Sequence, residues 1–326
     1  MRVLVTGASG FLGRSVVRQC AEAGHETIAL IRPLASTERL GWPSSVQVIR
    51  GDLRQRGDWC AAMGNVDAVI HLAAGTSGGL PDQLAASVVA TENLLACLTG
   101  KRLQRFVHCS TFSVYDVTAA RGRLTEESPL ETHPERRAAY TWTKLVQEKL
   151  VRDWAEAEAV PLAILRPGQI FGPGKLWDEG AAVRAGSLDL IFAPFSRMRL
   201  THVDNCAAAF VRALDSQATG VFNIVDDDLP THASYHRQCI RAGAKTGIGV
   251  YIPWFLVVLG GLMVRLINKL FFRGRAKLPE LLDLPRQRAR WKPLRYSNAR
   301  AKAELGWSPA LPMREAIRHS VQASRG

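Results

Sequence analysis

RVLVTGASGFLG, residues Arg2–Gly13, is a short apolar run followed by glycines at positions 7, 10 and 13. The run predicts a buried strand, and the helix-periodic residues after it predict a helix. Gly7 allows a sharp turn, Gly10 allows close approach to a pyrophosphate, and Gly13 allows the helix to pack on the strand. The pyrophosphate would lie on the free N–H groups of the helix. This stretch therefore predicts a dinucleotide-binding turn, formed by Gly7, Ser9, Gly10, Phe11, Leu12 and Gly13.

The segments after this turn alternate between strand-like and helix-like patterns. The expected strands are 27–31, 46–49, 68–72, 105–110, 162–166 and 221–225, and the expected helices are 58–63, 82–99 and 135–157. Such alternation is typical of a parallel sheet with helices on both faces. We expect an α/β, Rossmann-type doubly wound parallel sheet in residues 1–166, with 200–225 returning to it. Residues 167–199 and 226–326 would form a smaller, partly interleaved C-terminal substrate-binding domain.

The composition is that of a globular protein, with 326 residues and 47% hydrophobic side chains. The six cysteines are scattered, without a CxxC pair or a cluster at metal-ligand spacing. This predicts free thiols in a reducing compartment and no metal site. The chain enters a strand at once, without an apolar leader, so we expect a cytoplasmic location.

The net charge of +13 is concentrated near the C-terminus. Residues 265–302 contain twelve Lys or Arg and two Asp or Glu, an excess of 12 − 2 = +10. A phosphorylated substrate, an anionic lipid surface or a nucleic acid would each suit this charge. The sequence has no nucleic-acid-binding module, so we do not expect a nucleic acid as partner.

Arg32 follows the second expected strand, where dinucleotide folds that prefer NAD place an acidic residue for the ribose 2′-OH. A guanidinium suits a 2′-phosphate instead, and Arg14 could join it. The alternative is that both are solvated surface side chains. We expect NADP as the cofactor, with NAD as the second choice.

Asp52 and Leu53 follow the third strand, at the sheet edge where ligands bind. The Asp52 carboxylate can accept a hydrogen bond from the adenine amine, or it can simply cap a turn. After the fourth strand, Leu72, Ala73 and Ala74 are expected beneath the cofactor, because small residues let the backbone pass close to it. His71 lies within the apolar strand and is expected in the interior rather than as a catalyst.

Two pieces carry candidate chemistry: CSTFSVY (109–115), which runs off the fifth strand, and YTWTK (140–144), inside a long helix. Tyr140 and Lys144 are four residues apart and therefore share one helical face. We expect Lys144 to hold the nicotinamide ribose and to lower the pKa of Tyr140 toward the working pH. Tyr140 would exchange a proton with a substrate oxygen while a hydride moves to or from the nicotinamide. Thr111 would orient that oxygen.

TGASGFLG, Asp52, HLAA, STFSVY, YTWTK and LRPGQIFGPG resemble, in order and spacing, the extended short-chain dehydrogenase/reductase family, the epimerase/dehydratase-like group. The resemblance extends from residue 1 to the LGWSP stretch at 305–309. It implies Thr111, Tyr140 and Lys144 as the catalytic residues. It also implies that Pro167 and Ile170, in and after the LRP segment, approach the nicotinamide carboxamide.

Two positions depart from the family pattern. Ser87 stands where many members have the Asn of a proton relay, and a water held by Ser87 could substitute for it. Phe171 replaces the usual Tyr of RPxxxYGP, which removes a hydroxyl near the pocket. Both departures concern the catalytic site that the resemblance implies.

The sequence from Met198 onward points to the substrate. Val203-Asp204-Asn205 resembles the 3β-hydroxysteroid dehydrogenase branch, whereas epimerases commonly have VDD. Arg197 or Arg199 could still bind a diphosphate, so both branches stay open. Residues 226–228, three aspartates, are expected to form a turn rather than a metal site.

Residues 251–272, YIPWFLVVLGGLMVRLINKLFF, are strongly apolar. The uncharged part, 252–264, is too short to cross a bilayer, which needs about twenty residues. Three hypotheses remain: a helix that covers the substrate pocket, a peripheral membrane contact through 252–277, and a dimer surface. A membrane contact would place the protein at the inner face of a membrane.

Together these features predict an NADP-dependent oxidoreductase that interconverts a secondary alcohol and a ketone on a hydrophobic, sterol-like or long-chain small molecule. The alternative is a nucleotide-sugar epimerase or dehydratase with tightly held NAD(P). A non-catalytic binding protein is a third class, and the presence of both Tyr140 and Lys144 argues against it. The resemblance also suggests a homodimer.

Overall fold

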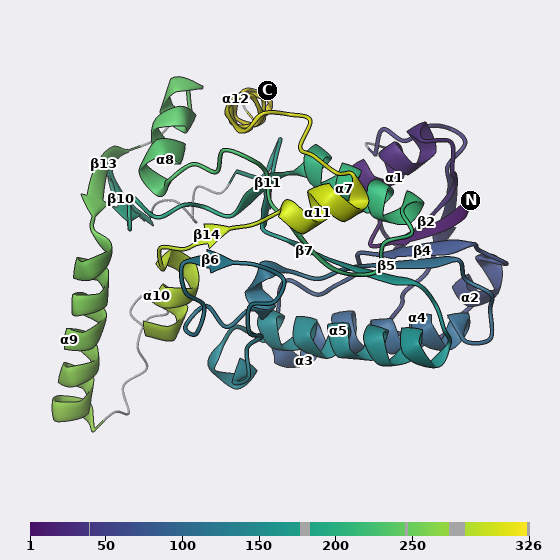
Figure 1. Ribbon diagram of the computed structural model, residues 1–326, viewed down its shortest axis with the longest axis horizontal. Helices are drawn as coiled ribbons and strands as arrows, with labels where there is room; N and C mark the ends of the chain where they lie inside the picture. Colours follow the sequence, from purple (N-terminus) through teal and green to yellow (C-terminus); the bar gives the residue numbers. More distant parts are fainter. Residues whose placement is uncertain (39, 177–182, 245–246, 274–283, 325–326) are drawn as a thin grey trace.

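The computed structural model describes residues 1–38, 40–176, 183–244, 247–273 and 284–324. Its centre is a seven-stranded parallel sheet in the order β12-β7-β5-β4-β1-β2-β3 (Figure 1). The strands are β1 (Arg2–Thr6), β2 (Glu26–Ile31), β3 (Gln47–Arg50), β4 (Ala68–His71), β5 (Arg105–Cys109), β7 (Leu162–Pro167) and β12 (Gly220–Ile224). The doubly wound α/β fold is confirmed.

Helices cover both faces of this sheet. On one face lie α1 (Phe11–Glu22), α7 (Val203–Asp215) and α11 (Ala299–Leu305); on the other lie α2 (Trp59–Ala62), α3 (Leu80–Leu84), α4 (Ala90–Leu98) and α5 (Ala139–Ala157) (Figure 1). Val3 and Val5 point into the first layer, and Leu4 points into the second. This alternation explains why the strands are apolar on both sides, as parallel strands between two helical layers must be.

The turn between β1 and α1 requires its glycines. Gly7 has a φ of +66°, and a Cβ there would lie 2.8 Å from the backbone nitrogen of Ala73. A Cβ on Gly13 would collide with the carbonyl oxygens of Gly7 and Ala8. The first glycine is thus fixed by a turn and the third by close helix packing, as the spacing predicts.

The remaining elements build the smaller part of the molecule, at the far end of the sheet (Figure 1). Its strands pair as β13-β10-β9, β11-β8 and β14-β6. These strands are β6 (Arg123–Leu124), β8 (Gln169–Phe171), β9 (Val183–Ala185), β10 (Leu188–Phe192), β11 (Leu200–His202), β13 (Ile248–Ile252) and β14 (Arg295–Tyr296). Its helices are α8 (His232–Arg241), α9 (Trp254–Phe272), α10 (Leu284–Trp291) and α12 (Met313–Ala323).

The C-terminal segment does not lie wholly in this smaller part, as the expected domain boundary had it. Ala301, Leu305 and Trp307 are buried in the core between α1, α7 and the main sheet. The Trp307 indole donates a hydrogen bond to the carbonyl oxygen of Asn205, at the start of α7. The segment is held on the main sheet because a buried indole needs both apolar contact and an acceptor.

The expected helix at 82–99 is interrupted. A π-helical turn (Ala85–Val89) separates α3 from α4. Within it the Ser87 hydroxyl accepts a hydrogen bond from the backbone N–H of Gly75, and its carbonyl accepts one from Thr91. Two short 3₁₀ turns also occur, Phe112–Val114 and Pro134–Arg136, and the second delays the start of α5 to Ala139.

The expectation that all six cysteines are free thiols is wrong in this structure. Cys60 in α2 and Cys97 in α4 form a disulfide, although 37 residues separate them in sequence. Both helices cover the same face of the sheet, which brings the two Cα atoms to 5.8 Å. Cys20, Cys109, Cys206 and Cys239 are free.

Asp226 is not part of a solvated turn, as expected for residues 226–228. It is buried, and its carboxylate accepts hydrogen bonds from the Thr201 hydroxyl, the His202 N–H and the Asn205 amide. Burial raises the pKa of Asp226 to about 6, although these donors oppose the shift. Asn205, singled out in the VDN motif, thus joins α7 to the loop after β12.

Candidate active site

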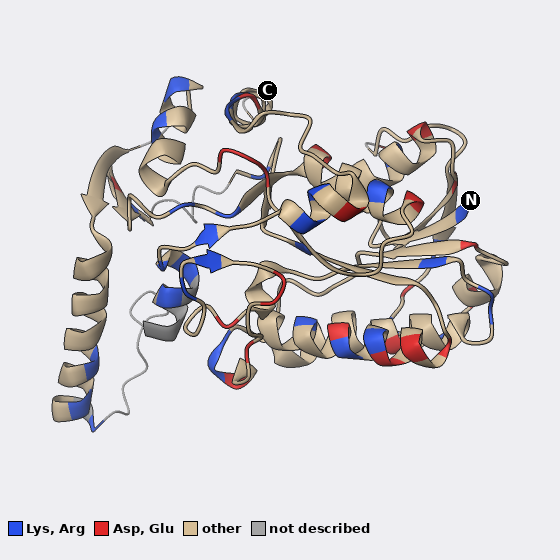
Figure 2. Cartoon of the chain, viewed as in Figure 1, with Lys and Arg blue, Asp and Glu red and all other residues tan. Residues whose placement is uncertain are grey.

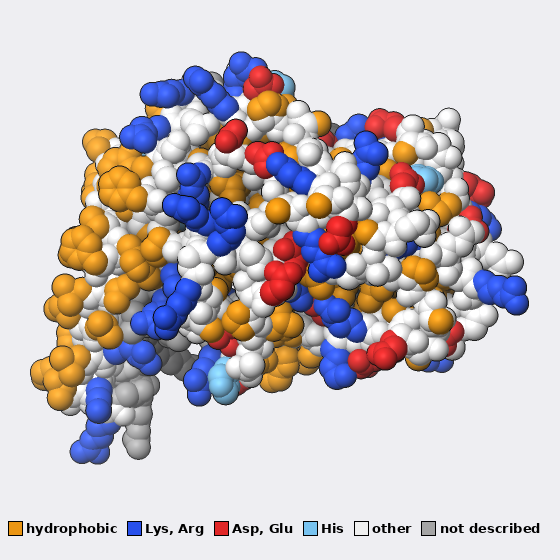
Figure 3. Space-filling model, in the orientation of Figure 1, with side chains coloured by type: hydrophobic (Ala, Val, Ile, Leu, Met, Phe, Trp, Pro, Cys, Tyr) orange, Lys and Arg blue, Asp and Glu red, His pale blue; other side chains and the backbone are white. Residues whose placement is uncertain are grey.

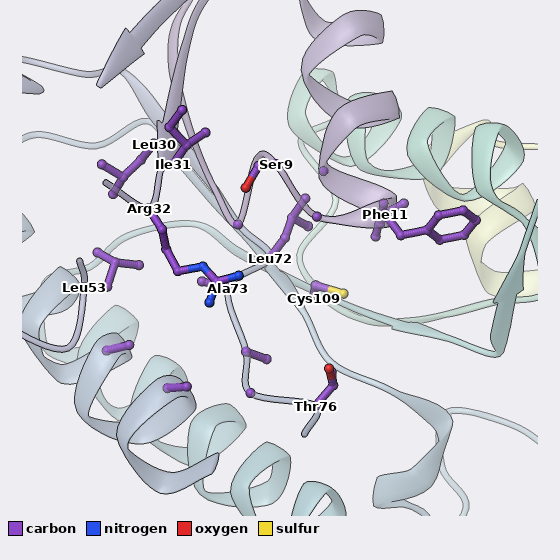
Figure 4. A pocket seen from close by; sticks show the side chains of 18 of the residues that line it. Ser9, Phe11, Leu30, Ile31, Arg32, Leu53, Leu72, Ala73, Thr76 and Cys109 are labelled. Atoms are coloured by element: carbon purple, nitrogen blue, oxygen red, sulfur yellow. The ribbon is translucent and has the colours of Figure 1, made fainter. Parts of the chain in front are cut away.

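A cavity of about 610 Å³ opens at the carboxyl ends of the central strands (Figure 4). Ligands of open α/β sheets bind at this edge. The predicted residues that line it are Gly7, Ser9, Gly10, Phe11, Leu12, Gly13, Arg32, Asp52, Leu53, Leu72, Ala73, Ala74, Tyr140, Lys144 and Ile170. Segments spread over 170 residues therefore meet around one cavity.

The start of α1 faces this cavity. Gly10 is its N-cap, and no side chain caps the helix or places an acidic group in its first turn. The free N–H groups and the positive end of the helix dipole are therefore available to an anion. This cradle, closed to any Cβ at Gly7 and Gly13, fits the pyrophosphate of a dinucleotide.

Three charged side chains lie at the β2–β3 end of the cavity. Arg32 is exposed after β2, and its guanidinium extends across the cavity toward Ala73 (Figure 4). Asp52 is paired with Arg54, whose Nη2 lies 2.6 Å from the carboxylate, and this hydrogen bond holds the pKa of Asp52 below its usual value. Arg14, expected beside Arg32, instead donates to the Ser9 carbonyl. Arg54, a second cation that lines the cavity, was missed, although it follows Asp52 directly in RGDLR.

Tyr140 lies on the first turn of α5, partly buried at the cavity. Its phenol hydrogen-bonds the Thr111 side chain, whose oxygen also accepts from the Ser113 N–H. Thr111 does not itself line the cavity, but this contact places its hydroxyl beside the phenol. The structure thus brings together the residues of the two predicted pieces.

The expectation that Lys144 lowers the pKa of Tyr140 is wrong in this structure. Burial raises the pKa of the phenol well above its ordinary value, while the Thr111 hydrogen bond lowers it only in part. The Lys144 ammonium is directed elsewhere: it donates to the Cys109 carbonyl at 2.6 Å and to Gln147 Oε1 at 2.5 Å. Burial in turn lowers the pKa of Lys144.

Gln147 is the centre of a buried polar cluster behind Lys144. While its Oε1 accepts from Lys144, its Nε2 donates to the Thr91 hydroxyl at 2.7 Å and to the Ala73 carbonyl at 3.0 Å. His71 joins the cluster through Thr6 and Thr91 and is fully buried, as expected for an interior histidine. Gln147 was missed because its role depends on contacts with three other elements. Ser87 hydrogen-bonds Gly75, while Gln147 is the group that contacts Lys144.

Two predicted positions lie outside the lining of this cavity. Pro167, expected near the carboxamide, ends β7 and is buried beside Ile224 of β12. Phe171, expected near the pocket, is fully buried with its ring against His202. Lining residues that the sequence analysis missed include Thr76, Cys109 and Lys175; the Lys175 ammonium lies 5.1 Å from the Phe11 ring centroid.

The apolar helix α9 does not cover the cavity. None of its described residues lines it, and α9 stands at the opposite end of the molecule from α1 and β2 (Figure 1). The hypothesis that 251–272 covers the pocket is therefore wrong for this cavity.

A second cavity, of about 570 Å³, lies in the smaller part of the molecule. It is lined by Arg123, Arg197 and Arg295 together with Phe195. Arg197 also donates to the Leu229 carbonyl. Three guanidinium groups around one hollow suit an anionic ligand.

Comparison with known proteins agrees with this site. The model of the NAD dependent epimerase/dehydratase family matches residues 3–225. The chain is 28% identical over 339 residues to a 2-alkyl-3-oxoalkanoate reductase of Stenotrophomonas maltophilia, covering 99% of both chains. It is 26% identical over 341 residues to a 3 beta-hydroxysteroid dehydrogenase/Delta 5-->4-isomerase of Mycobacterium tuberculosis, covering 97% of this chain and 88% of that one.

Among solved structures, the chain resembles the UDP-glucuronic acid 4-epimerase of Bacillus cereus in complex with NAD. The TM-score is 0.73 at 20% identity, with 100% of this chain and 99% of that chain covered. This likeness concerns the fold.

Proposed function

The chain belongs to the NAD-dependent epimerase/dehydratase family, an extended short-chain dehydrogenase/reductase, and from that premise we propose that it is an NADP-dependent ketoreductase. Its substrate would be a hydrophobic, sterol-like or long-chain ketone. One observation carries this proposal: Tyr140 lies at the cavity with its phenol on Thr111, and Lys144 lies one turn along the same helix face.

The raised pKa of Tyr140 favours the direction of reduction. A phenol whose pKa lies above its ordinary value stays protonated at neutral pH, so it acts as a proton donor. Tyr140 would donate to the carbonyl oxygen of the substrate, and Thr111 would hold that oxygen by a hydrogen bond. A bound nicotinamide supplies the hydride. Lys144, anchored on Cys109 and Gln147, presents a fixed positive charge beside the site.

The preference for NADP rests on Arg32 with Arg54 nearby. Both guanidinium groups line the β2–β3 end of the cavity, where a 2′-phosphate would add a charge that NAD lacks. The Asp52 carboxylate is already neutralised by Arg54, so it repels such a phosphate less. The family and its solved members establish a nicotinamide dinucleotide; the choice of NADP is our proposal.

Arg32→Ala should weaken NADP binding about tenfold to a hundredfold, because a charge-assisted hydrogen bond contributes about 1.5–3 kcal/mol. NAD binding should change little. Titration of both cofactors by fluorescence measures this, with Arg56→Ala, an exposed arginine outside the cavity lining, as the matched control. Tighter binding of NAD than of NADP by the unmodified protein would overturn the assignment.

The hydrophobic substrate is supported by two relatives, named as a 2-alkyl-3-oxoalkanoate reductase and a 3 beta-hydroxysteroid dehydrogenase. Both names describe oxidoreductases of apolar molecules with a ketone or secondary alcohol. The Val203-Asp204-Asn205 motif points in the same direction.

Tyr140→Phe tests the chemistry. It removes the proton donor and keeps the ring, so turnover of an apolar ketone with NADPH should fall at least a hundredfold while NADPH still binds. Loss of absorbance at 340 nm follows turnover, and fluorescence follows binding. Tyr296→Phe, on β14 away from the cavity, serves as the control. Unchanged turnover by Tyr140→Phe would contradict the proposal.

The second cavity favours one rival function. Its three arginines would suit the diphosphate of a nucleotide-sugar, the substrate of an epimerase or dehydratase. Such an enzyme reoxidises its cofactor within each cycle, so it would retain NAD(P) through purification and consume no added NADPH. Native mass measurement of the purified protein, with and without added NADPH, separates the two functions.

Two expectations stay predictions. A homodimer would form through the face of α4 and α5, next to which Val89 and Trp142 are exposed. A cytoplasmic location would supply the NADPH that the proposed reduction needs.

A further inference from the structure

Exposed apolar side chains gather at one end of the molecule. Of the 21 large apolar side chains that are exposed in the described part of the chain, 13 lie between residues 240 and 271. They come from α8, β13 and α9: Ile240, Ile248, Val250, Tyr251, Phe255, Leu256, Leu259, Leu262, Met263, Leu266, Ile267, Leu270 and Phe271. Figure 3 shows them as a band along the α9 edge of the molecule. Contiguous surfaces of this kind mark interaction sites.

The helix α9 has two distinct sides. At 100° per residue, the nine exposed apolar side chains from Phe255 to Phe271 cover about half of its circumference. Val257, Gly261 and Asn268 occupy the opposite side and are buried. Val257 packs with Trp291 of α10, so this side fastens the helix to the protein. The apolar half faces away from the molecule.

Arg265 and Lys269 are exposed along one border of this apolar half. Figure 2 shows Lys and Arg near the C-terminal end of α9 and no acidic side chain on it. The wider sequence has the same bias: residues 229–279 contain eight Lys or Arg and no Asp or Glu. An apolar face with cations at its border fits the headgroup region of an anionic bilayer.

We infer that α9 and β13 dock on an anionic lipid surface, with the α9 axis parallel to the membrane and Phe255, Leu259, Leu266 and Leu270 among the acyl chains. Arg265 and Lys269 extend from the border of the helix to lipid phosphates. This interaction goes beyond the proposed reductase function and does not depend on it.

Two other occupants fit the observations less well. By length and composition, 254–271 could cross a membrane, with a mean hydropathy of 1.7. A crossing helix would, however, carry Arg265 and Lys269 into the hydrocarbon and detach Val257 and Asn268 from the protein. A second copy of this chain would bring cations against cations, because α9 has no carboxylate to pair with them.

Cosedimentation of the full chain with vesicles tests this inference. Vesicles of phosphatidylcholine with 30% phosphatidylglycerol should carry most of the protein at low salt, and vesicles of phosphatidylcholine alone much less. Leu259→Glu/Leu266→Glu should reduce binding at least tenfold, because it places two carboxylates in the docking face without disturbing buried contacts. Leu34→Glu, a fully exposed apolar residue outside this band, is the matched control and should bind as the unmodified chain does.

Arg265→Gln/Lys269→Gln should weaken binding and reduce its dependence on salt. Alkaline carbonate should release the bound protein from the vesicles. Equal binding by the Leu259→Glu/Leu266→Glu variant, or no binding at low salt, would overturn the inference. Retention after carbonate would show a spanning helix, and a vesicle-free dimer that dissociates in that variant would show self-association; either result would also overturn it. NADPH turnover without vesicles reports separately on the reductase function.

Discussion

At the scale of single residues, the site depends on where the Lys144 ammonium is held. It lies against Gln147 and the Cys109 carbonyl rather than against the Tyr140 phenol. Gln147 also donates to Ala73, in the segment beneath the expected cofactor. One buried amide therefore connects the catalytic lysine to the cavity wall.

Gln147→Met tests this connection, because Met has a similar volume and cannot hydrogen-bond in the same way. The buried ammonium loses an acceptor, so the pKa of Lys144 should fall further. We expect turnover to decrease about tenfold or more, since hydrogen bonds to charged groups contribute about 1.5–3 kcal/mol. The pH at which kcat/KM depends on protonated Lys144 should also move downward, as a pH–rate profile would show.

A merely structural role of Gln147 would lower the melting temperature and leave that pH unchanged. Gln104→Met, outside this cluster and away from the cavity lining, controls for the substitution itself. An unaltered pH–rate profile in Gln147→Met would contradict a positioning role.

At the scale of elements, α5 carries both the chemistry and its anchor. Tyr140 and Lys144 face the cavity, and one turn further Glu148 forms a buried ion pair with Arg166 of β7 through two hydrogen bonds, of 2.8 and 2.7 Å. The Arg166 guanidinium also lies 4.7 Å from the centroid of the Tyr115 ring. This contact fixes the rotation of the helix and, with it, the direction of Tyr140.

Glu148→Gln should lower the free energy of unfolding by about 3–5 kcal/mol, because the buried guanidinium loses its counter-charge. Chemical denaturation measures the change. Lys149→Gln is the matched control on the next residue: its ion pair with Asp153 is exposed, so we expect a loss below about 0.5 kcal/mol. Similar losses in both variants would show that the buried pair does not anchor α5.

At the scale of the whole molecule, buried histidines set the response to acid. Burial lowers the pKa of His71 to about 3, that of His232 to about 4, and that of His108 well below its ordinary value. The unfolded chain binds these protons below about pH 6.5, whereas the folded chain does not. The stabilisation is therefore complete above pH 6.5 and is lost progressively as the pH falls.

The free energy of unfolding should decrease between pH 7 and pH 5, by up to about 1.4 kcal/mol per pH unit for each buried histidine. Asp226 opposes this in part: its raised pKa of about 6 means that the folded chain takes up a proton first. Denaturation curves at several pH values measure the slope. His232→Gln should flatten it and the exposed His133→Gln should not; a flat profile for the unmodified protein would refute the prediction.

The sequence by itself determined the fold and most of the cofactor cavity. Glycine spacing, apolar strands and the Tyr140–Lys144 interval are local patterns, because turns, pleats and helix faces repeat over a few residues. Parallel strands also end at one edge, so residues after separate strands, such as Arg32, Asp52 and Leu72, could be assigned to one site.

Only the tertiary structure decided which group each side chain touches. Lys144 turns to Gln147 instead of Tyr140, Asp226 is buried, Cys60 meets Cys97, and α9 exposes its apolar face away from the cavity. These outcomes depend on contacts between residues far apart in the chain. Periodicity and spacing describe single elements, and they do not specify how one element packs against another.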